Sequence, residues 1–334
     1  MLRQADYCRF WCWGGLYLAV WFVLYARSSK AFCDEIQPGF CGPYFSIIGA
    51  MKCGTNAVAE FLSQHPHIEQ QNFENFFFSD RIGMPKYNEP TYEPGSVEPL
   101  PGALDRYAEV IGIKTDWITS FTYDKSPGYL HLPLVPERMA RILPQVRIIV
   151  MVCDPVEKLR SMYYHYKRIQ QQQQQQIKIK QQQQQKIKRK IVFVMEEKMI
   201  STLPSFDEFA HWCMWVSLNQ NRTSGCAFLQ HGFYESHLQR WVAAMAGKEH
   251  FFLVESEKLK INPQLTMKKV ISFLNLSVDL YPSVHKQTVY ENILNPRNNS
   301  SSVTTDLLLR SVYSRTYMYL RQEWGIDLLK NTYY

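Results

Sequence analysis

The stretch of sequence that decides the fold is Ile-Ile-Gly-Ala-Met-Lys-Cys-Gly-Thr-Asn, residues 47–56. It overlaps the apolar, β-prone run YFSIIGA (residues 44–50) and leads into residues 56–65, whose apolar side chains recur at helical spacing. A buried strand, a glycine-bounded loop and a helix in that order direct backbone N–H groups and a helix N-terminus toward an anion. These residues therefore predict an anion-binding loop at the end of a strand.

The spacing inside the loop narrows the class of ligand that the loop is expected to bind. Gly49 and Gly54 have the G-x4-G spacing of a nucleotide P-loop, but the Lys-Ser/Thr pair of ATP- and GTP-binding loops does not follow them. The lysine lies inside the loop instead, at Lys52, and Thr55 is placed to cap the helix. A P-loop kinase or NTPase is therefore a weak alternative. The pattern resembles the 5′-phosphosulfate loop, G-x-x-K-x-G-T, of sulfotransferases that use 3′-phosphoadenylyl sulfate (PAPS).

Further strands and helices follow along the chain. Residues 147–152 (RIIVMV) and 250–254 (HFFLV) are apolar runs typical of buried strands, and residues 156–166 have helical spacing. Residues 83–102 are dense in Pro, Gly and Glu and predict a surface loop. Strands that alternate with helices indicate an α/β fold with a mainly parallel sheet covered on both faces.

Four more segments, in the right order, extend the resemblance to the carbohydrate (glycosaminoglycan-type) sulfotransferases of the Golgi over residues 44–329. They are Phe73–Phe78, similar to K-E-x-x-F-F; Asp124–Tyr129, similar to E-K-[S/T]-P-x-Y; Val152–Ser161, similar to R-D-P-V-x-R-x-x-S; and Gly232–Leu276, similar to G-x-Y-x-x-H-L-x-x-W with a following strand and helix end. The resemblance implies one domain over residues 43–330 with the sulfotransferase fold, a P-loop-like parallel sheet flanked by helices on both faces. It also implies transfer of a sulfuryl group from PAPS to a carbohydrate hydroxyl.

The resemblance assigns roles to the residues that match its motifs. Glu74 is the expected general base, Lys52 is expected to stabilise the leaving 5′-phosphate, and Lys125 is a second cation near the sulfuryl group or acceptor. The expected cofactor-binding residues are Lys52, Cys53, Gly54, Thr55, Asn56, Cys153, Ser161 and Tyr234. The aromatic run after Glu74 favours a partly buried carboxylate over a surface one, whereas Tyr234 is equally compatible with a core position. No metal is implied, and no C-x-x-C pair indicates a zinc site.

Two residues depart from the family pattern. Cys153 stands where the family has an arginine that binds the 3′-phosphate, and Phe73 stands where it often has a lysine. Loss of a charge-assisted contact costs about 1.5–3 kcal/mol of cofactor binding. The candidates to replace this arginine are Arg147, Lys158, Arg160 and Arg297. The departures motivate a second function, a catalytically weak, sulfotransferase-like glycan-binding protein.

The N-terminal segment has the features of a membrane anchor. Residues 10–26 (FWCWGGLYLAVWFVLYA) contain no charged side chain and predict a short transmembrane signal-anchor. Residues 1–9 would then form a cytoplasmic tail and residues 27–42 a short stem, in a single-pass type II Golgi membrane protein whose catalytic domain is lumenal. The alternative is a cleaved signal peptide with its small-residue site at residues 29–31. Four Asn-x-Ser/Thr sequons give weak support for a lumenal domain.

Composition limits the remaining possibilities. The chain has 334 residues, of which 46% are hydrophobic, and this excludes disorder throughout. The formal net charge of +7 comes from one segment, because residues 167–190 hold eight basic side chains and no acidic one. The rest of the chain is close to neutral, so no nucleic-acid partner is expected; a glycan acceptor and the membrane are the expected partners.

Two local features complete the predictions. Residues 168–190 form a low-complexity insert of glutamine tracts interleaved with Ile and Lys, which predicts a solvated loop or a fraying helix between two helices. Among eight cysteines, Cys213 and Cys226 flank a polar segment that a disulfide could close, and Cys33 and Cys41 could pair likewise in the stem. Free, buried thiols are the alternative.

Overall fold

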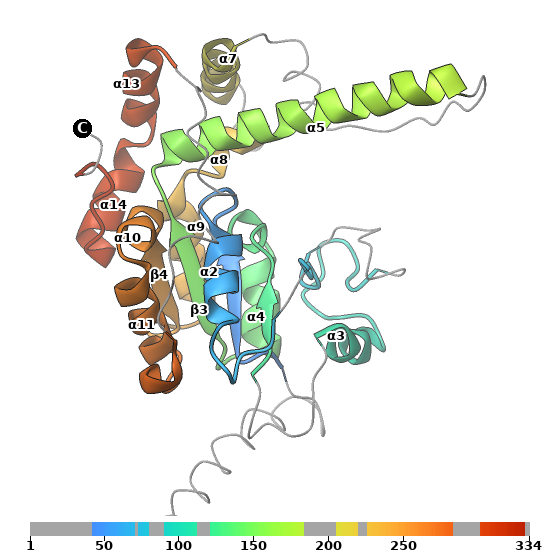
Figure 1. The fold of residues 1–334 in the computed structure, drawn as a ribbon, viewed down its shortest axis with the longest axis vertical. Coiled ribbons are helices and arrows are strands. Elements are labelled where there is room, and N and C mark those ends of the chain that lie inside the picture. Colours follow the sequence, from blue (N-terminus) through green and yellow to red (C-terminus); the bar gives the residue numbers. More distant parts are fainter. Residues whose placement is uncertain are drawn as a thin grey trace, which may run out of the picture.

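A four-stranded parallel sheet with the order β2-β1-β3-β4 forms the centre of the computed structural model (Figure 1). The structure describes residues 42–70, 73–79, 90–111, 121–183, 205–219, 226–282 and 301–330. The strands are β1 (Phe45–Gly49), β2 (Tyr123–Lys125), β3 (Arg147–Val152) and β4 (Phe251–Glu255). Three of them confirm the strands predicted from apolar runs. The three-residue β2 was not predicted, because so short a strand carries no periodic signal.

The strand register brings the functional motifs to one edge of the sheet. Ser46 lies beside Asp124 of β2 and Ile148 of β3, and Val152 of β3 lies beside Glu255 of β4. All four strands run in the same direction, so the segments that follow them meet at their carboxyl ends. Open α/β sheets bind their ligands at this edge.

Helices cover the sheet in two layers. The elements between β1 and β4 are α2 (Thr55–Leu62), α3 (Ala103–Ile111), η1 (Tyr129–His131), α4 (Val135–Ile142), α5 (Pro155–Gln183), α7 (Phe206–Asn219), α8 (Ala227–Gln230) and α9 (Tyr234–Ala244). After β4 come α10 (Ser256–Ile261), α11 (Pro263–Phe273), η2 (Val278–Leu280), α13 (Val303–Val312) and α14 (Ser314–Trp324). Helix α2 packs with α11, and α4 packs with α9. Right-handed crossovers place these two pairs on opposite faces of the sheet.

A second hydrophobic cluster lies beside the sheet. It joins the first turns of α5 to α7, α8, α13 and α14 through buried side chains such as Leu159, Tyr163 and Phe209. A disulfide between Cys213 and Cys226 ties α7 to the start of α8 and confirms the predicted pairing. Cys213 lies within α7 rather than beside a loop, because the helix continues to Asn219.

The glutamine tract is helical as far as the structure describes it. Helix α5 starts near the predicted position and continues without a break to Gln183, projecting from the body of the molecule (Figure 1). The loop interpretation of residues 170–183 was therefore wrong, and the helical one holds for them. Glutamine and lysine are good helix formers, and the packed first turns of α5 supply the nucleus from which the helix propagates.

Several predictions concern residues outside the described ranges. They are the cytoplasmic tail at 1–9, the span at 10–26, the stem at 27–41, the Cys33–Cys41 pair, Arg297 and residues 184–190 of the insert. Within the described part of the chain, no helix combines the length and apolar character that crossing a bilayer requires. The sequon that starts at Asn275 is described, and Asn275 is exposed two residues after the end of α11.

Candidate functional site

The anion-binding loop predicted from sequence joins β1 to α2. Gly54 adopts a left-handed conformation (φ 94°), as does Lys52 (φ 68°), and the turn is held by hydrogen bonds from Ala50 N to Met151 O (2.9 Å) and from Cys53 N to Ala50 O (3.2 Å). Gly54 is the N-cap of α2, so the expectation that Thr55 caps the helix was wrong; Thr55 is the first helical residue and is buried. The first-turn N–H groups of α2 point into this loop, as an anion site requires.

Gly49 is required at the end of β1 by a close approach. A Cβ atom at this position would lie 2.7 Å from Leu130 Cβ in η1. Any larger residue would therefore push η1 away from β1. The contact keeps the loop after β1 close to the Asp124–Tyr129 segment, which carries the second predicted site motif.

Lys125 connects that second motif to the loop. Its Nζ donates a hydrogen bond to Asn56 Oδ1 of α2 at 2.9 Å, and the side chain is only 8% exposed. Burial lowers the pKa of Lys125, whereas the negative charge of Glu74 acts to raise it. The structure therefore brings Lys125, Asn56 and Glu74 together. Glu74 itself is exposed, as is Lys52, and the predicted partial burial of the Glu74 side chain was wrong.

The segment that carries Glu74 is held by its backbone. Ser126 Oγ accepts hydrogen bonds from the backbone N–H groups of Asn75 (3.2 Å) and Phe76 (2.9 Å). The same Oγ donates to Asp124 Oδ1 at 2.7 Å. Asp124 and Ser126 hold this segment, and Lys125 between them is the buried cation. One strand and its end therefore set the spacing between the predicted base and the cation.

Asp124 is a positioning residue that the sequence interpretation did not single out. Its buried carboxylate also accepts hydrogen bonds at Oδ2 from Tyr107 Oη (3.0 Å) and Tyr129 Oη (3.3 Å). Burial raises the pKa of Asp124 to about 6, although these hydroxyl donors act to lower it. The signal that could have identified it is the acidic first position of the Asp-Lys-Ser-Pro motif.

A disulfide joins Cys53 in the loop to Cys153 at the end of β3, with 5.4 Å between their Cα atoms. Cys153 is therefore half of a disulfide, a pairing that was not predicted from the sequence. Tyr234 is fully buried against this bridge: its Oη lies 3.3 Å from Cys53 Sγ and donates to the carbonyl oxygen of Cys153 at 3.2 Å. Ser256 Oγ, at the end of β4, donates to the carbonyl oxygen of Cys53.

Three of the four cations proposed to replace the missing arginine interact with other groups of the protein. Arg147 lies at the amino end of β3, opposite the loop, where it donates to Tyr44 Oη at 2.6 Å. Lys158 is buried with its Nζ 3.5 Å from Met162 Sδ, and burial lowers its pKa to about 7. The fourth, Arg297, lies outside the described residues. No described candidate is therefore left to take over the arginine's role at Cys153.

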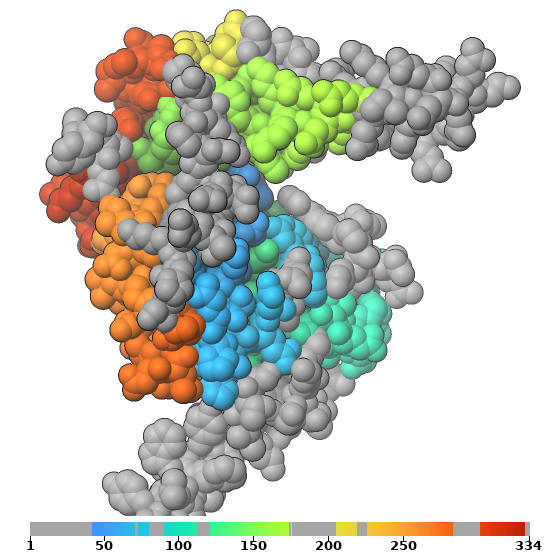
Figure 2. All heavy atoms as spheres, viewed as in Figure 1, coloured from blue at the N-terminus to red at the C-terminus, as the bar shows by residue number. Residues whose placement is uncertain are grey.

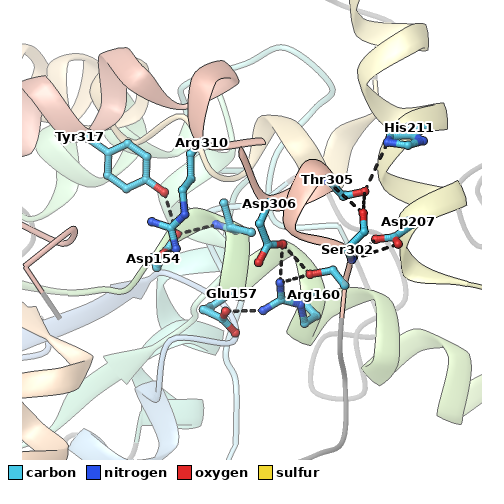
Figure 3. Close-up of polar contacts among 12 residues, drawn as sticks. Asp154, Glu157, Arg160, Asp207, His211, Ser302, Thr305, Asp306, Arg310 and Tyr317 are labelled. Carbon is cyan, nitrogen blue, oxygen red and sulfur yellow. Dashed lines mark hydrogen bonds and ion pairs between the residues drawn. The ribbon is translucent and has the colours of Figure 1, made fainter. Parts of the chain in front are cut away.

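Arg160, the third of these, belongs to a polar network between α5 and α13 (Figure 3). It forms ion pairs with Glu157 and with Asp306, the latter at 2.7 Å. Beside it, Asp154 Oδ1 accepts from the N–H of Val156 (2.9 Å) and from Tyr317 Oη (2.8 Å). Asp154 therefore caps the start of α5 and links it to α14.

Ser161 lies on the second turn of α5 and is partly exposed. In the described part of the chain its hydroxyl makes no hydrogen bond, so the group is available to a ligand. Within those same ranges no cluster of His, Cys, Asp and Glu side chains could hold a metal ion.

Comparison with known proteins identifies the fold and family. The family model described as "Sulfotransferase domain" matches residues 43–319. Human bifunctional heparan sulfate N-deacetylase/N-sulfotransferase 2 is 25% identical over 255 residues, covering 75% of this chain and 23% of the relative; the mouse type 3 protein is 26% identical with the same coverage. The chain thus spans about a quarter of the length of these relatives. A sulfotransferase structure from Alicyclobacillus acidocaldarius matches with a TM-score of 0.55 and 19% identity, over 86% of this chain and 98% of that one. The chain belongs to the sulfotransferase family.

Proposed function

We propose that residues 43–330 bind PAPS at the loop after β1 and transfer its sulfuryl group to a carbohydrate acceptor. The observation that carries the proposal is the convergence of three elements on one sheet edge. The loop with Lys52 lies at the N-terminus of α2, Lys125 is hydrogen bonded to that helix, and the charge of Glu74 acts on Lys125. An anion cradle, a buried cation and a nearby carboxylate are the groups that sulfuryl transfer needs.

The residues present fit a nucleotide with two phosphate groups. The glycine-bounded loop and the first turn of α2 offer N–H donors to the 5′-phosphosulfate, and Lys52 is exposed beside them. Cys153 and Ser161 lie after β3, the neighbouring strand, where the family resemblance expects the 3′-phosphate. Thr55 and Asn56 begin the helix, so their contribution comes through backbone N–H groups and the Asn56 amide.

The chemistry assigned to these residues is a direct displacement at sulfur. Glu74 accepts the proton of the acceptor hydroxyl while the oxygen of that hydroxyl attacks the sulfur atom of PAPS. The bond from sulfur to the bridging oxygen breaks, and its electron pair remains on the 5′-phosphate of the departing 3′,5′-ADP. Lys52 stabilises that developing charge, and Lys125 stabilises the equatorial sulfuryl oxygens or the acceptor. No metal is needed for this charge balance.

The acceptor is proposed to be a glycosaminoglycan-type glycan. Figure 2 shows the surface hollowed between the projecting α5 and the blue and teal atoms of residues 42–70, 73–79 and 90–111, with the loop region at its inner end. An extended saccharide could lie there and present one group to Glu74. The relatives' names specify heparan sulfate and transfer to nitrogen, so both a hydroxyl and the free amine of a glucosamine unit belong in the test.

The direct test is incubation of the full chain with radiolabelled PAPS and a panel of glycans: N-deacetylated heparosan, heparan sulfate, chondroitin and a neutral oligosaccharide. Label in one glycan class supports the enzyme and identifies the acceptor. Binding of 3′,5′-ADP without transfer to any glycan favours the glycan-binding alternative, which the disulfide-bonded Cys153 in place of arginine motivates. Thermal stabilisation by ATP with Mg²⁺ but not by 3′,5′-ADP would indicate a P-loop NTPase instead.

We further propose that the domain works in the Golgi lumen, anchored by residues 10–26. The disulfides Cys53–Cys153 and Cys213–Cys226 support an oxidising compartment. In microsomes from cells that express the full chain, protease added outside should spare the domain, and N-glycosidase should shift its mass. Degradation of the domain without detergent would contradict the type II orientation.

A further inference from the structure

The disulfide Cys53–Cys153 joins the two segments to which the proposed function assigns the nucleotide's two phosphates. Cys53 lies between Lys52 and Gly54 in the loop after β1. Cys153 directly follows β3, the strand that pairs with β1, and precedes α5 with Ser161. The two cysteines are 100 positions apart in the sequence, but the bridge brings them together at the edge of the sheet.

The surroundings of the bridge hold it in place. Cys53 is 2% exposed, and the fully buried Tyr234 contacts its sulfur and binds the Cys153 carbonyl from α9. Ser256 binds the Cys53 carbonyl from the end of β4. The two cysteine carbonyls are therefore held by hydrogen bonds from α9 and from the residue after β4, and the bridge links the loop covalently to the end of β3.

None of the three described cations proposed to replace the family's arginine at position 153 is available for that role, and Arg147 lies at the other end of β3. Arg160 is engaged by Glu157 and Asp306, and Lys158 lies in the interior beside Met162. Affinity for a second phosphate then depends on neutral donors of this segment such as the Ser161 hydroxyl, because Asp154 already accepts from the N–H of Val156 in the first turn of α5. Donors of modest strength gain most when they are held in the bound arrangement before the ligand arrives.

We propose that the Cys53–Cys153 disulfide is a positioning element for the nucleotide: it holds the 5′-phosphate loop and the 3′-phosphate segment at the spacing of one doubly phosphorylated ligand. This inference rests on the proposed function. It predicts that breaking the bridge weakens a ligand that spans both segments much more than a ligand that touches one. The two segments act as linked half-sites, and the disulfide sets their effective concentration.

The test compares 3′,5′-ADP with 5′-AMP by isothermal titration calorimetry on the full chain. In a Cys53→Ser/Cys153→Ser variant, the preference for 3′,5′-ADP over 5′-AMP should fall roughly tenfold, while the Kd of 5′-AMP changes by less than about threefold. The matched control is Cys213→Ser/Cys226→Ser, which removes the other disulfide and should leave the preference unchanged. A variant that retains the wild-type preference, or weakens both ligands equally, overturns the proposal.

A second measurement tests the proposal if the Cys53→Ser/Cys153→Ser variant fails to fold. In the Cys213→Ser/Cys226→Ser background, dithiothreitol reduces the Cys53–Cys153 bridge to two thiols and is itself oxidised to its cyclic disulfide. The preference for 3′,5′-ADP should fall on reduction and return on reoxidation, and an unchanged preference in the reduced protein, confirmed by thiol titration, overturns the proposal. Failure of the oxidised wild type to bind 3′,5′-ADP would instead reject the proposed function.

Discussion

At the scale of single residues, the proposed chemistry depends on two oppositely charged side chains in different environments. Lys125 is buried and its ammonium group is hydrogen bonded to Asn56, whereas Glu74 is exposed on a segment whose backbone is fixed. An exposed carboxylate can be reached by an acceptor that approaches from solvent. The buried lysine keeps a fixed direction and loses little conformational freedom in the transition state.

Substitution of the proposed base separates catalysis from binding. Glu74→Gln should lower kcat for sulfuryl transfer roughly a hundred- to ten-thousandfold, because general-base catalysis is lost. The Kd of 3′,5′-ADP, measured by calorimetry, should change little, since the amide keeps the shape of the side chain. Glu60→Gln on the exposed surface of α2 is the control and should retain wild-type kcat. A Glu74→Gln variant with wild-type kcat would remove Glu74 from the mechanism.

At the scale of elements, β2 carries more of the site than its three residues suggest. Asp124 points into the core and binds Ser126, which holds the Glu74 segment, while Lys125 points to α2. Alternation along the strand therefore places Asp124, which positions the Glu74 segment, and Lys125, the proposed functional cation, on opposite faces. The loop after β1 is arranged likewise, since Lys52 is exposed and Cys53 is buried.

The buried carboxylate of Asp124 predicts a defined pH dependence of stability. Its pKa is raised from 3.8 to about 6 in the folded protein. At pH values between these two pKa values, the native state therefore holds a proton on Asp124 that the unfolded state has lost. Its contribution to stability is therefore full below pH 3.8 and is lost as the pH rises to 6. Relative to Asp124→Asn, which cannot titrate, the wild type should gain about 1 kcal/mol between pH 7 and pH 5. Urea unfolding of both proteins at pH 5, 6 and 7 measures this; a constant difference would contradict it.

At the scale of the whole molecule, polar and covalent links connect the sheet edge to the C-terminal helices. Asp154 follows Cys153 directly, caps α5, accepts from Tyr317 and lies 3.0 Å from a guanidinium nitrogen of Arg310 (Figure 3). The candidate nucleotide site and α13–α14 are therefore parts of one packed unit, although 163 positions separate Asp154 from Tyr317 in the sequence.

Two substitutions of Asp154 separate these contributions. Asp154→Ala should lower the free energy of unfolding by roughly 3 kcal/mol, because the helix cap and the Tyr317 hydrogen bond are both lost. Asp154→Asn keeps an acceptor for both and loses only the charge facing Arg310, so the cost should be about 1 kcal/mol. Urea unfolding at pH 7 provides the comparison. Equal losses in the two variants would show that charge, rather than hydrogen bonding, dominates.

The disulfides should differ in their effect on stability. The Cys53–Cys153 pair encloses a sequence separation of 100 residues and Cys213–Cys226 one of 13. In the chain-entropy description these loops correspond to about 4.7 and about 3 kcal/mol. The Cys53→Ser/Cys153→Ser variant should therefore unfold at lower urea concentration than Cys213→Ser/Cys226→Ser under non-reducing conditions. The opposite order would indicate that structure remaining in the unfolded state outweighs loop closure.

Local sequence was sufficient for much of the fold. The strands at β1, β3 and β4, the loop after β1 and the start of α5 each follow from short patterns, because apolar periodicity and glycine spacing act within a few residues. The motif around Lys125 was also visible, although its strand was not. The burial of Glu74 was predicted wrongly, since an aromatic run fixes the segment but not the direction of the neighbouring side chain.

The sequence by itself determined the family, the order of strands and helices along the chain, and the residue types at the sheet edge. Only the tertiary structure decided that Cys53 pairs with Cys153, that Arg160 is bound to Asp306, and that Asp124 holds the Glu74 segment through Ser126. The physical reason is that these contacts join residues from about 50 to more than 140 positions apart. Such distances are closed by packing of the whole chain, and no local pattern records which partners meet.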